Sequence, residues 1–224
     1  MRRWIFEQSL TLFFLALFLA SLLGQSIAGL LKHNEDAAAH GSETMSYGRY
    51  LVSSDFGLAV MENWQSEYLQ FTLFILATIW LVQKGSNESK PETDAGLESD
   101  QKQLIGGYAR ESSPKWAKTR GWRTHLYSNS LLLVMALIFF GSWGAQSVTS
   151  LNVYNDEQRE HEGAVVSWGE YLTRSDFWEK TLQNWQSEFL AIATMAVFTI
   201  YLRQRGSPES KPVGAPHDDT GASG

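Results

Sequence analysis

Two glutamates are the residues whose type and position most favour chemistry. Glu67 and Glu188 each end an Asn-Trp-Gln-Ser-Glu motif and are followed by a stretch of apolar residues. A carboxyl group inside a membrane-spanning segment is a candidate for binding a proton or a cation. The alternative is that each carboxyl group is protonated or hydrogen-bonded and holds neighbouring helices together. We favour this alternative, because no row of polar residues continues along the apolar stretch to its far end.

Carboxylates and imidazoles form a second recurring pattern. Asp36 precedes His40 by four residues, and Glu157 precedes His161 by the same spacing, which would place each pair on one face of a helix. Such side chains can hold a divalent metal such as zinc, but two ligands in each segment are too few for a tight site unless the segments cooperate. We keep these four residues as weak metal candidates and prefer the interpretation of a solvated helix end.

No pattern typical of an enzyme appears elsewhere. The chain lacks a nucleophile–base pair, a phosphate-binding loop, a dinucleotide fingerprint and a metallohydrolase signature, and it contains no cysteine. With 18 basic and 24 acidic residues, the net charge of -6 argues against nucleic-acid binding. We therefore predict a protein that is not an enzyme and carries no cofactor.

Four apolar blocks must position these residues. The uncharged runs at residues 9–31 and 128–151 exceed the length of about 20 residues that a membrane-spanning helix needs. The blocks that end near residues 82 and 202 reach this length only if they begin upstream, which gives spans at about 63–82 and 183–202. Trp64 and Trp185 then lie at the membrane surface as interface anchors. Because the first block has a counterpart in the middle of the chain, we interpret it as a permanent span and not as a signal peptide.

The chain repeats itself. Residues 1–91 align with residues 122–212 without a gap, and roughly a third of the aligned positions are identical. We expect an all-α protein, a four-helix transmembrane bundle formed by tandem duplication of a two-helix unit. Parallel repeats of this kind pack about a pseudo-twofold axis along the membrane normal. The linker at 92–121 and the tail at 213–224 are rich in small and polar residues, so we expect both to be disordered.

The basic residues predict the orientation of the spans. About 13 of the 18 lysines and arginines lie before the first span, between the two repeats or after the last span. Because positive charges gather on the cytoplasmic side of a membrane, both termini should be cytoplasmic. The pairs Ser54-Asp55 and Ser175-Asp176 are good helix N-caps, so we expect the helices that contain the shorter spans to begin there.

Small and polar residues predict how the spans pack. Small side chains one turn apart let helices approach closely in lipid, within one chain or between two copies of it. Polar side chains at similar depth should form a layer shared by both repeats. The packing residues are Ala20, Gly24, Ala28, Gly141, Ala145 and Thr149, and the polar layer comprises Gln25, Gln65, Ser66, Glu67, Gln146, Gln186, Ser187 and Glu188.

The second half of the chain carries distinctive motifs. They are Asn-Asp-Glu-Gln-Arg-Glu-His at 155–161, Gly-Glu-Tyr-Leu at 169–172, Asn-Trp-Gln-Ser-Glu-Phe-Leu at 184–190 and Gln-Arg-Gly-Ser-Pro-Glu-Ser-Lys at 204–211. This combination resembles a family of uncharacterised bacterial multi-pass membrane proteins. The first half departs from it, with Arg49 in place of Glu170 and Asn87 in place of Pro208. The resemblance implies an integral protein of the bacterial cytoplasmic (inner) membrane and brings no activity, substrate or cofactor.

These observations leave two functional hypotheses. We expect a structural, lipid-interacting or partner-binding protein of the cell envelope, whose partners are the lipid bilayer and either a second copy or another membrane protein. The alternative is a small proton- or cation-coupled transporter or channel that uses Glu67 and Glu188.

Overall fold

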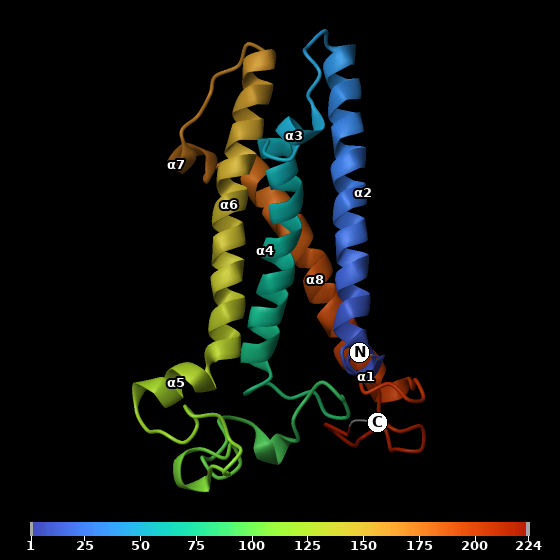
Figure 1. Cartoon of the computed structure of the whole chain (residues 1–224), viewed down its shortest axis with the longest axis vertical. Coiled ribbons are helices and arrows are strands. Elements are labelled where there is room, and N and C mark those ends of the chain that lie inside the picture. The colour runs from blue at the N-terminus through green and yellow to red at the C-terminus, as the bar shows by residue number, and fades with distance from the viewer. Residues whose placement is uncertain (1, 223–224) are drawn as a thin grey trace. The chain divides into compact units, whose positions relative to one another are not determined.

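The computed structural model describes residues 2–222, and this part of the chain is all-helical, without a strand (Figure 1). It forms two compact units, one of residues 1–60 with 145–168 and one of residues 61–144 with 169–224. The helices are α1 (Arg2–Glu7), α2 (Ser9–Ala39), α3 (Tyr47–Tyr50), α4 (Ser54–Ala77), α5 (Trp122–Ser128), α6 (Ser130–Glu160), α7 (Trp168–Tyr171) and α8 (Ser175–Tyr201), with short 3-10 helices η1 (Glu92–Asp94) and η2 (Gly106–Tyr108) in the linker.

Two of the helices are long and apolar enough to cross a membrane. α2 and α6 have 31 residues each, and both pass this test by length and composition alone. At 1.5 Å per residue, each is about 46 Å long and exceeds the hydrocarbon thickness of about 30 Å. No other helix within residues 2–222 passes the test, so the spans at 63–82 and 183–202 stay predictions.

The two shorter helices begin where the serine–aspartate pairs predict, at Ser54 and Ser175. The predicted caps are wrong in detail. In the first repeat, the hydroxyl of Ser53 accepts the N–H of Phe56 at 3.3 Å, and α8 has no side-chain cap. α4 also ends at Ala77, before the end expected at residue 82, whereas α8 continues to Tyr201.

In the first unit, one asparagine after each long apolar run fixes the segment that returns from the helix end. The side chain of Asn34 accepts the N–H of Met45 at 2.7 Å and donates to its carbonyl at 3.0 Å. Asn155 makes the same pair of bonds with Val166, at 2.9 and 3.0 Å. Each amide group thus replaces a backbone partner and holds an otherwise irregular segment against its helix.

The returning segments are fixed a second time by an aromatic side chain. The hydroxyls of Tyr47 and Ser26 lie 2.8 Å apart, and the indole of Trp168 donates to the hydroxyl of Ser147 at 3.0 Å. Both serines are buried. A tyrosine and a tryptophan therefore perform the same task at positions 47 and 168, which correspond in the alignment of the two repeats.

In the second unit, the Gly-Ser-x-Glu-Ser-Lys motifs form matching turns after α4 and α8. The hydroxyl of Ser89 accepts the N–H of Gln83 at 2.9 Å, and the hydroxyl of Ser210 accepts the N–H of Gln204 at 2.9 Å. Gly85 and Gly206 have φ of 82° and 85°, which glycine adopts without strain. The two turns also meet, because the side chain of Asn87 donates to the carbonyl of Pro208 at 3.3 Å.

Lys211 is the most unusual side chain of these turns, because it is 1% exposed. Its ammonium group lies within 2.7–3.1 Å of four carbonyl oxygens, those of Gly85, Pro216, His217 and Asp219. Burial lowers the pKa of this group, and the nearby Arg203 lowers it further. The lysine thus joins the turn after α4 to the tail.

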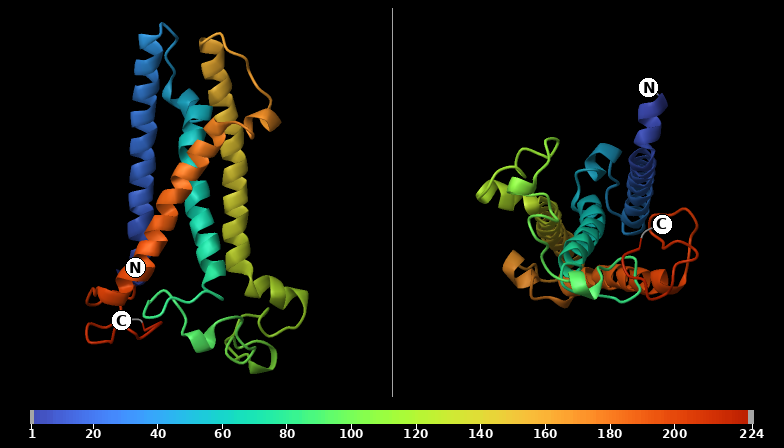
Figure 2. Two further views of the ribbon diagram at one scale, coloured as in Figure 1. Left: turned by 180° about the vertical axis from the view of Figure 1, so that it is seen from behind. Right: turned by 90° about the horizontal axis from the view of Figure 1, so that it is seen from below.

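The tail lies beside the end of α8 (Figure 2), and further hydrogen bonds fix it. The imidazole of His217 lies 3.0 Å from the carbonyl of Ile200, and the hydroxyl of Thr220 accepts the N–H of Gly85 at 2.8 Å. Disorder of the linker and the tail was expected from their composition and stays a prediction. The structure describes both as turns, with η1 and η2 in the linker.

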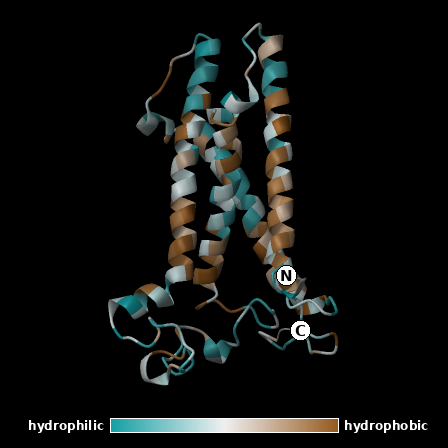
Figure 3. Cartoon of the chain, in the orientation of Figure 1, coloured by the Kyte–Doolittle hydropathy of each residue, from teal (hydrophilic) through white to brown (hydrophobic). Residues whose placement is uncertain are grey.

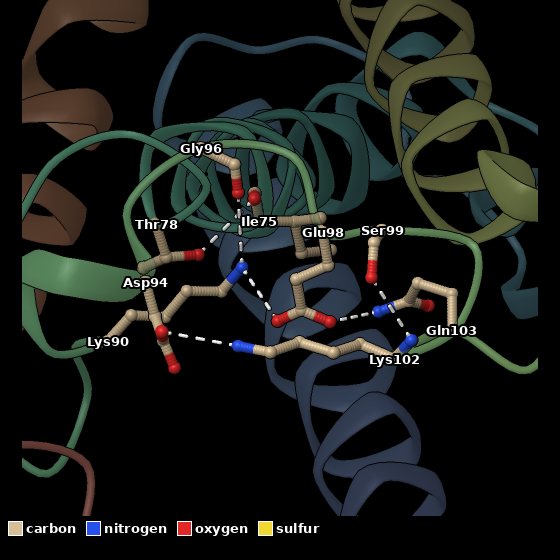
Figure 4. A network of polar contacts seen from close by, with 9 residues as sticks. All are labelled: Ile75, Thr78, Lys90, Asp94, Gly96, Glu98, Ser99, Lys102 and Gln103. Atoms are coloured by element: carbon tan, nitrogen blue, oxygen red, sulfur yellow. Dashed lines mark hydrogen bonds and ion pairs between the residues drawn. The ribbon is translucent and has the colours of Figure 1, made fainter.

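A network of charges organises the first part of the linker (Figure 4). Lys90 pairs with Glu98 at 3.1 Å, and Lys102 pairs with Asp94 at 3.2 Å. Hydrogen bonds from Lys90 and Gln103 lower the pKa of the Glu98 carboxyl group. The basic residues of this part of the linker therefore have carboxylate partners.

Replacing Lys211 by methionine tests the turn and tail contacts. Methionine fills similar space but donates no hydrogen bond, so four carbonyls lose a partner, and we expect the free energy of unfolding to fall by about 2–3 kcal/mol. Lys90→Met is the matched control, because Lys90 occupies the corresponding position in the first repeat, is half-buried and pairs mainly with Glu98. For this variant, the free energy of unfolding should fall by less than about 1 kcal/mol. Denaturant titration of the purified chain measures both. Equal losses would contradict this account of Lys211.

Candidate functional site

The two Asn-Trp-Gln-Ser-Glu motifs meet inside the second unit through Gln65 and Trp185. The indole of Trp185 donates to the side-chain oxygen of Gln65 at 2.6 Å, and the amide of Gln65 donates to the carbonyl of Glu62 at 3.0 Å. Gln65 is fully buried. Trp185, which was predicted as an interface anchor, therefore donates a hydrogen bond to a buried amide group on α4. This bond explains why a glutamine can be buried at position 65.

Aromatic rings surround Trp185. Its ring centroid lies 5.8 Å from that of Trp143 and 6.4 Å from that of Phe139. Trp143 also stacks on Phe139 and Phe177, at 5.7 and 6.2 Å. These rings pack α6 against α8, and they add apolar contact area around the hydrogen bond between Trp185 and Gln65.

Glu67 and Glu188 lie near this contact and interact electrostatically with each other. Glu67 is exposed and Glu188 is half-buried. This electrostatic interaction links the two carboxyl groups, and a proton or cation shared between them stays a prediction.

The rest of the predicted polar layer is divided between the two units. In the second unit, Ser66 is buried and donates to the carbonyl of Asn63, whereas Gln186 and Ser187 are exposed. In the first unit, Gln25 donates to the carbonyl of Ala59 at 3.3 Å. Gln146 is fully buried there, and its amide atoms have no hydrogen-bond partner among the described residues. A continuous layer stays a prediction.

The predicted packing residues have unequal surroundings. Ala20, Gly24 and Ala28 are exposed, as is Gly141, and Ala145 is half-buried. Gly24 and Gly141 have no neighbouring side chain within 4 Å of the position that a Cβ would occupy, among the residues the structure describes. Thr149 does pack closely, because its methyl group lies against Gly57 of α4. Packing through the whole stripe therefore stays a prediction.

A cavity of about 580 Å³ lies in the first unit, at the ends of α2 and α6. It contains three of the four weak metal candidates, Asp36, His40 and Glu157, but not His161. Further carboxylates line it, with His33 lying 3.8 Å from Asp55. Within residues 2–222, no three acidic, histidine or cysteine side chains are arranged to hold a metal ion, so the geometry gives the metal hypothesis no support.

The first two turns of α8 contain the charged residues Asp176 and Lys180. Asp176 accepts the hydroxyl of Tyr171 at 2.7 Å and pairs with Lys180 at 2.9 Å. Burial raises the pKa of the nearby Glu62 carboxyl group, and Lys180 only partly offsets this. These contacts position the first turns of α8.

Sequence reasoning missed several residues that hold the fold together. Ser26 and Ser147 occupy corresponding positions in the two repeats, and Lys211 corresponds to Lys90. This identity between the repeats was the signal in the sequence that could have identified them. Trp143 has no such signal, because leucine stands at the corresponding position 22. Its place in the aromatic cluster comes only from the three-dimensional packing.

The surface of α2 is the largest unexplained feature of the molecule. Its apolar side chains are exposed from one end of the uncharged run to the other, and only the last turns are polar (Figure 3). In the most hydrophobic window of this helix, 6% of the residues are buried. Exposed members include Phe13, Phe14, Leu17, Phe18, Leu19, Leu23 and Ile27.

Comparison with known proteins gives a family and no activity. The model of one family, described as "Domain of unknown function (DUF6766)", matches residues 1–222. No curated protein and no solved structure matches the chain significantly. The match confirms that the chain is a member of an uncharacterised family, whereas a bacterial origin stays a prediction.

Replacing Trp185 by phenylalanine tests the contact between the two motifs. Phenylalanine keeps an aromatic ring but leaves the buried oxygen of Gln65 without this donor, and we expect the free energy of unfolding to fall by about 1 kcal/mol. Trp178→Phe is the control, because Trp178 is 39% exposed and donates to the carbonyl of Leu172 near the surface. Denaturant titration in detergent compares the two variants. A larger loss for the control would contradict the central role of Gln65.

Proposed function

Because the chain belongs to the DUF6766 family, whose description names no activity, we propose its function from the physical properties of its helices. The protein is an integral membrane protein without enzymatic activity, located in the bacterial cytoplasmic membrane, and it acts through contacts with lipid or with a membrane-protein partner. The observation that carries this proposal is the apolar surface of α2.

A soluble protein rarely exposes a continuous apolar patch of more than a few hundred Å². On α2, the run from Ser9 to Leu31 has no charged residue, and side chains such as Phe14 (60% exposed) and Leu23 (56% exposed) project from it. Within the first unit, the returning segments leave most of this run exposed. Lipid or an apolar partner helix provides the environment that such a surface needs.

The architecture we propose is a tandem duplication of a two-span unit. Corresponding residues make the same contacts in the two repeats: Asn34 and Asn155 hold the returning segments, and Ser89 and Ser210 hold the turns. These pairs support four spans with parallel repeats. Both termini are then cytoplasmic, because the linker and the two chain ends carry most of the basic residues.

The second candidate function is proton- or cation-coupled transport. It rests on the electrostatic interaction between Glu67 and Glu188, because paired carboxyl groups of this kind can share a proton or bind a cation. The apolar rings packed around Trp185, three residues before Glu188 on the same helix, count against it, because an ion path needs polar or hydrated surroundings.

One reconstitution experiment tests the proposed function. The full chain is inserted into liposomes, the vesicles are washed with alkaline carbonate, and proton, sodium and potassium flux is measured under a pH gradient. We expect the protein to stay with the vesicles after the wash and the flux to equal that of empty vesicles. The Glu67→Gln, Glu188→Gln double variant should insert equally well and differ only in stability.

Two outcomes would contradict this proposal. Release of the protein by the wash would mean that α2 is covered by something other than a bilayer. Flux that the native protein shows and the folded double variant loses would favour transport through the glutamate pair.

A further inference from the structure

The end of the linker and the helix α5 that follows it form a short segment in which basic and aromatic residues alternate. Residues 115–127 contain Lys115, Lys118, Arg120 and Arg123, and they contain no acidic residue. All four basic side chains are exposed. The aromatic members Trp116, Trp122 and Tyr127 are exposed as well, at 41%, 67% and 43%. We call residues 115–127 the basic–aromatic segment.

The cations of this segment are unpaired, unlike those of the preceding linker. Within residues 2–222, none of the four has a carboxylate within ion-pair distance, whereas Lys90 and Lys102 pair with Glu98 and Asp94. The contrast is informative because both groups lie on the same stretch of chain, between the end of α4 and the start of α6. The basic–aromatic segment therefore presents four positive charges that no carboxylate neutralises, although the ammonium group of Lys118 donates to the carbonyl of Glu111.

The segment is folded and not merely basic. The hydroxyl of Thr124, which is buried, donates to the carbonyls of Thr119 and Trp116 at 2.7 and 3.0 Å. These bonds bring the chain back on itself, and the rings of Trp116 and Trp122 lie 6.3 Å apart. The guanidinium group of Arg123 lies 5.5 Å from the centre of the Trp122 ring. At least one cation of the segment therefore lies against its paired rings.

This surface is continuous with a helix that can span a membrane. α5 ends at Ser128, α6 begins at Ser130, and the first turns of α6 expose Leu131, Leu133 and Val134. If α6 enters the bilayer here, the rings lie at the depth of the lipid headgroups, where tryptophan and tyrosine are enriched. The four exposed cations, which precede α6 directly in the chain, then lie close to the phosphate groups of the same leaflet.

We propose that the basic–aromatic segment is a binding surface for anionic phospholipid headgroups. The inference rests on the proposed membrane insertion and names the lipid class that the protein contacts. Clusters of lysine and arginine beside a span bind anionic lipid with about 1 kcal/mol per charge, which is about fivefold in affinity for each residue. The interaction is electrostatic, so salt weakens it.

Hydrogen exchange of the full chain in lipid nanodiscs tests the proposal. The discs contain phosphatidylcholine alone or an equal mixture of phosphatidylcholine and phosphatidylglycerol. In the mixture we expect exchange of the amides at 115–127 to slow by at least about tenfold, well within the roughly 600-fold gain in affinity that four charges at about fivefold each would give. High salt should reverse this protection. Exchange within α2 should not differ between the two lipids.

Two fourfold variants with equal loss of charge give the control. Lys115→Gln, Lys118→Gln, Arg120→Gln and Arg123→Gln together should abolish the difference between the lipids. The matched variant replaces Arg3, Lys102, Arg159 and Arg174 by glutamine, and these cations already have carboxylate partners. It should keep the native protection.

Three results would overturn the proposal. They are equal exchange of the segment in the two lipids, equal loss of protection in both variants, or stronger protection by a short RNA added to neutral discs. Failure of the chain to enter any nanodisc is a different result, because it would contradict the membrane insertion itself.

Discussion

The apolar surface of α2 imposes the constraint on which the rest of the structure depends. A helix of 31 residues with an uncharged run of this length gains little from contacts within its own unit, where only Ser26 among its residues is fully buried. Such a helix is stable in water only if another surface covers it. A bilayer removes this requirement, and it also favours helices, because their backbone groups are satisfied internally.

Polar side chains then fix the returning segments, the contact between α4 and α8 and the turns at the helix ends, which the backbone hydrogen bonds of the helices do not hold. Asn34 and Asn155 fix the returning segments, and Gln65 receives the indole N–H of Trp185. At the ends of α4 and α8, serine hydroxyls and Lys211 satisfy the exposed backbone of the turns. Few apolar residues are fully buried, so these hydrogen bonds carry much of the specificity of the fold.

The sequence predicted the elements better than their contacts. The starts of α4 and α8 followed from serine–aspartate pairs, and α2 and α6 followed from uncharged runs. The early end of α4 at Ala77 could not be predicted, because the carbonyl of Ile79 there accepts an N–H from Gly96 in the linker. The hydrogen bond between Gln65 and Trp185 could not be predicted either. Hydrophobic periodicity indicates which face of a helix is buried, but not which residue packs against that face.

The central claim is that α2 lies in lipid, and the absence of cysteine from the chain allows a direct measurement. Single cysteines placed along α2 are treated in intact membranes with a maleimide that cannot cross them. The account predicts no labelling from Leu10 to Leu31 and labelling at Glu35 and Ala38. Uniform labelling along the helix would contradict it.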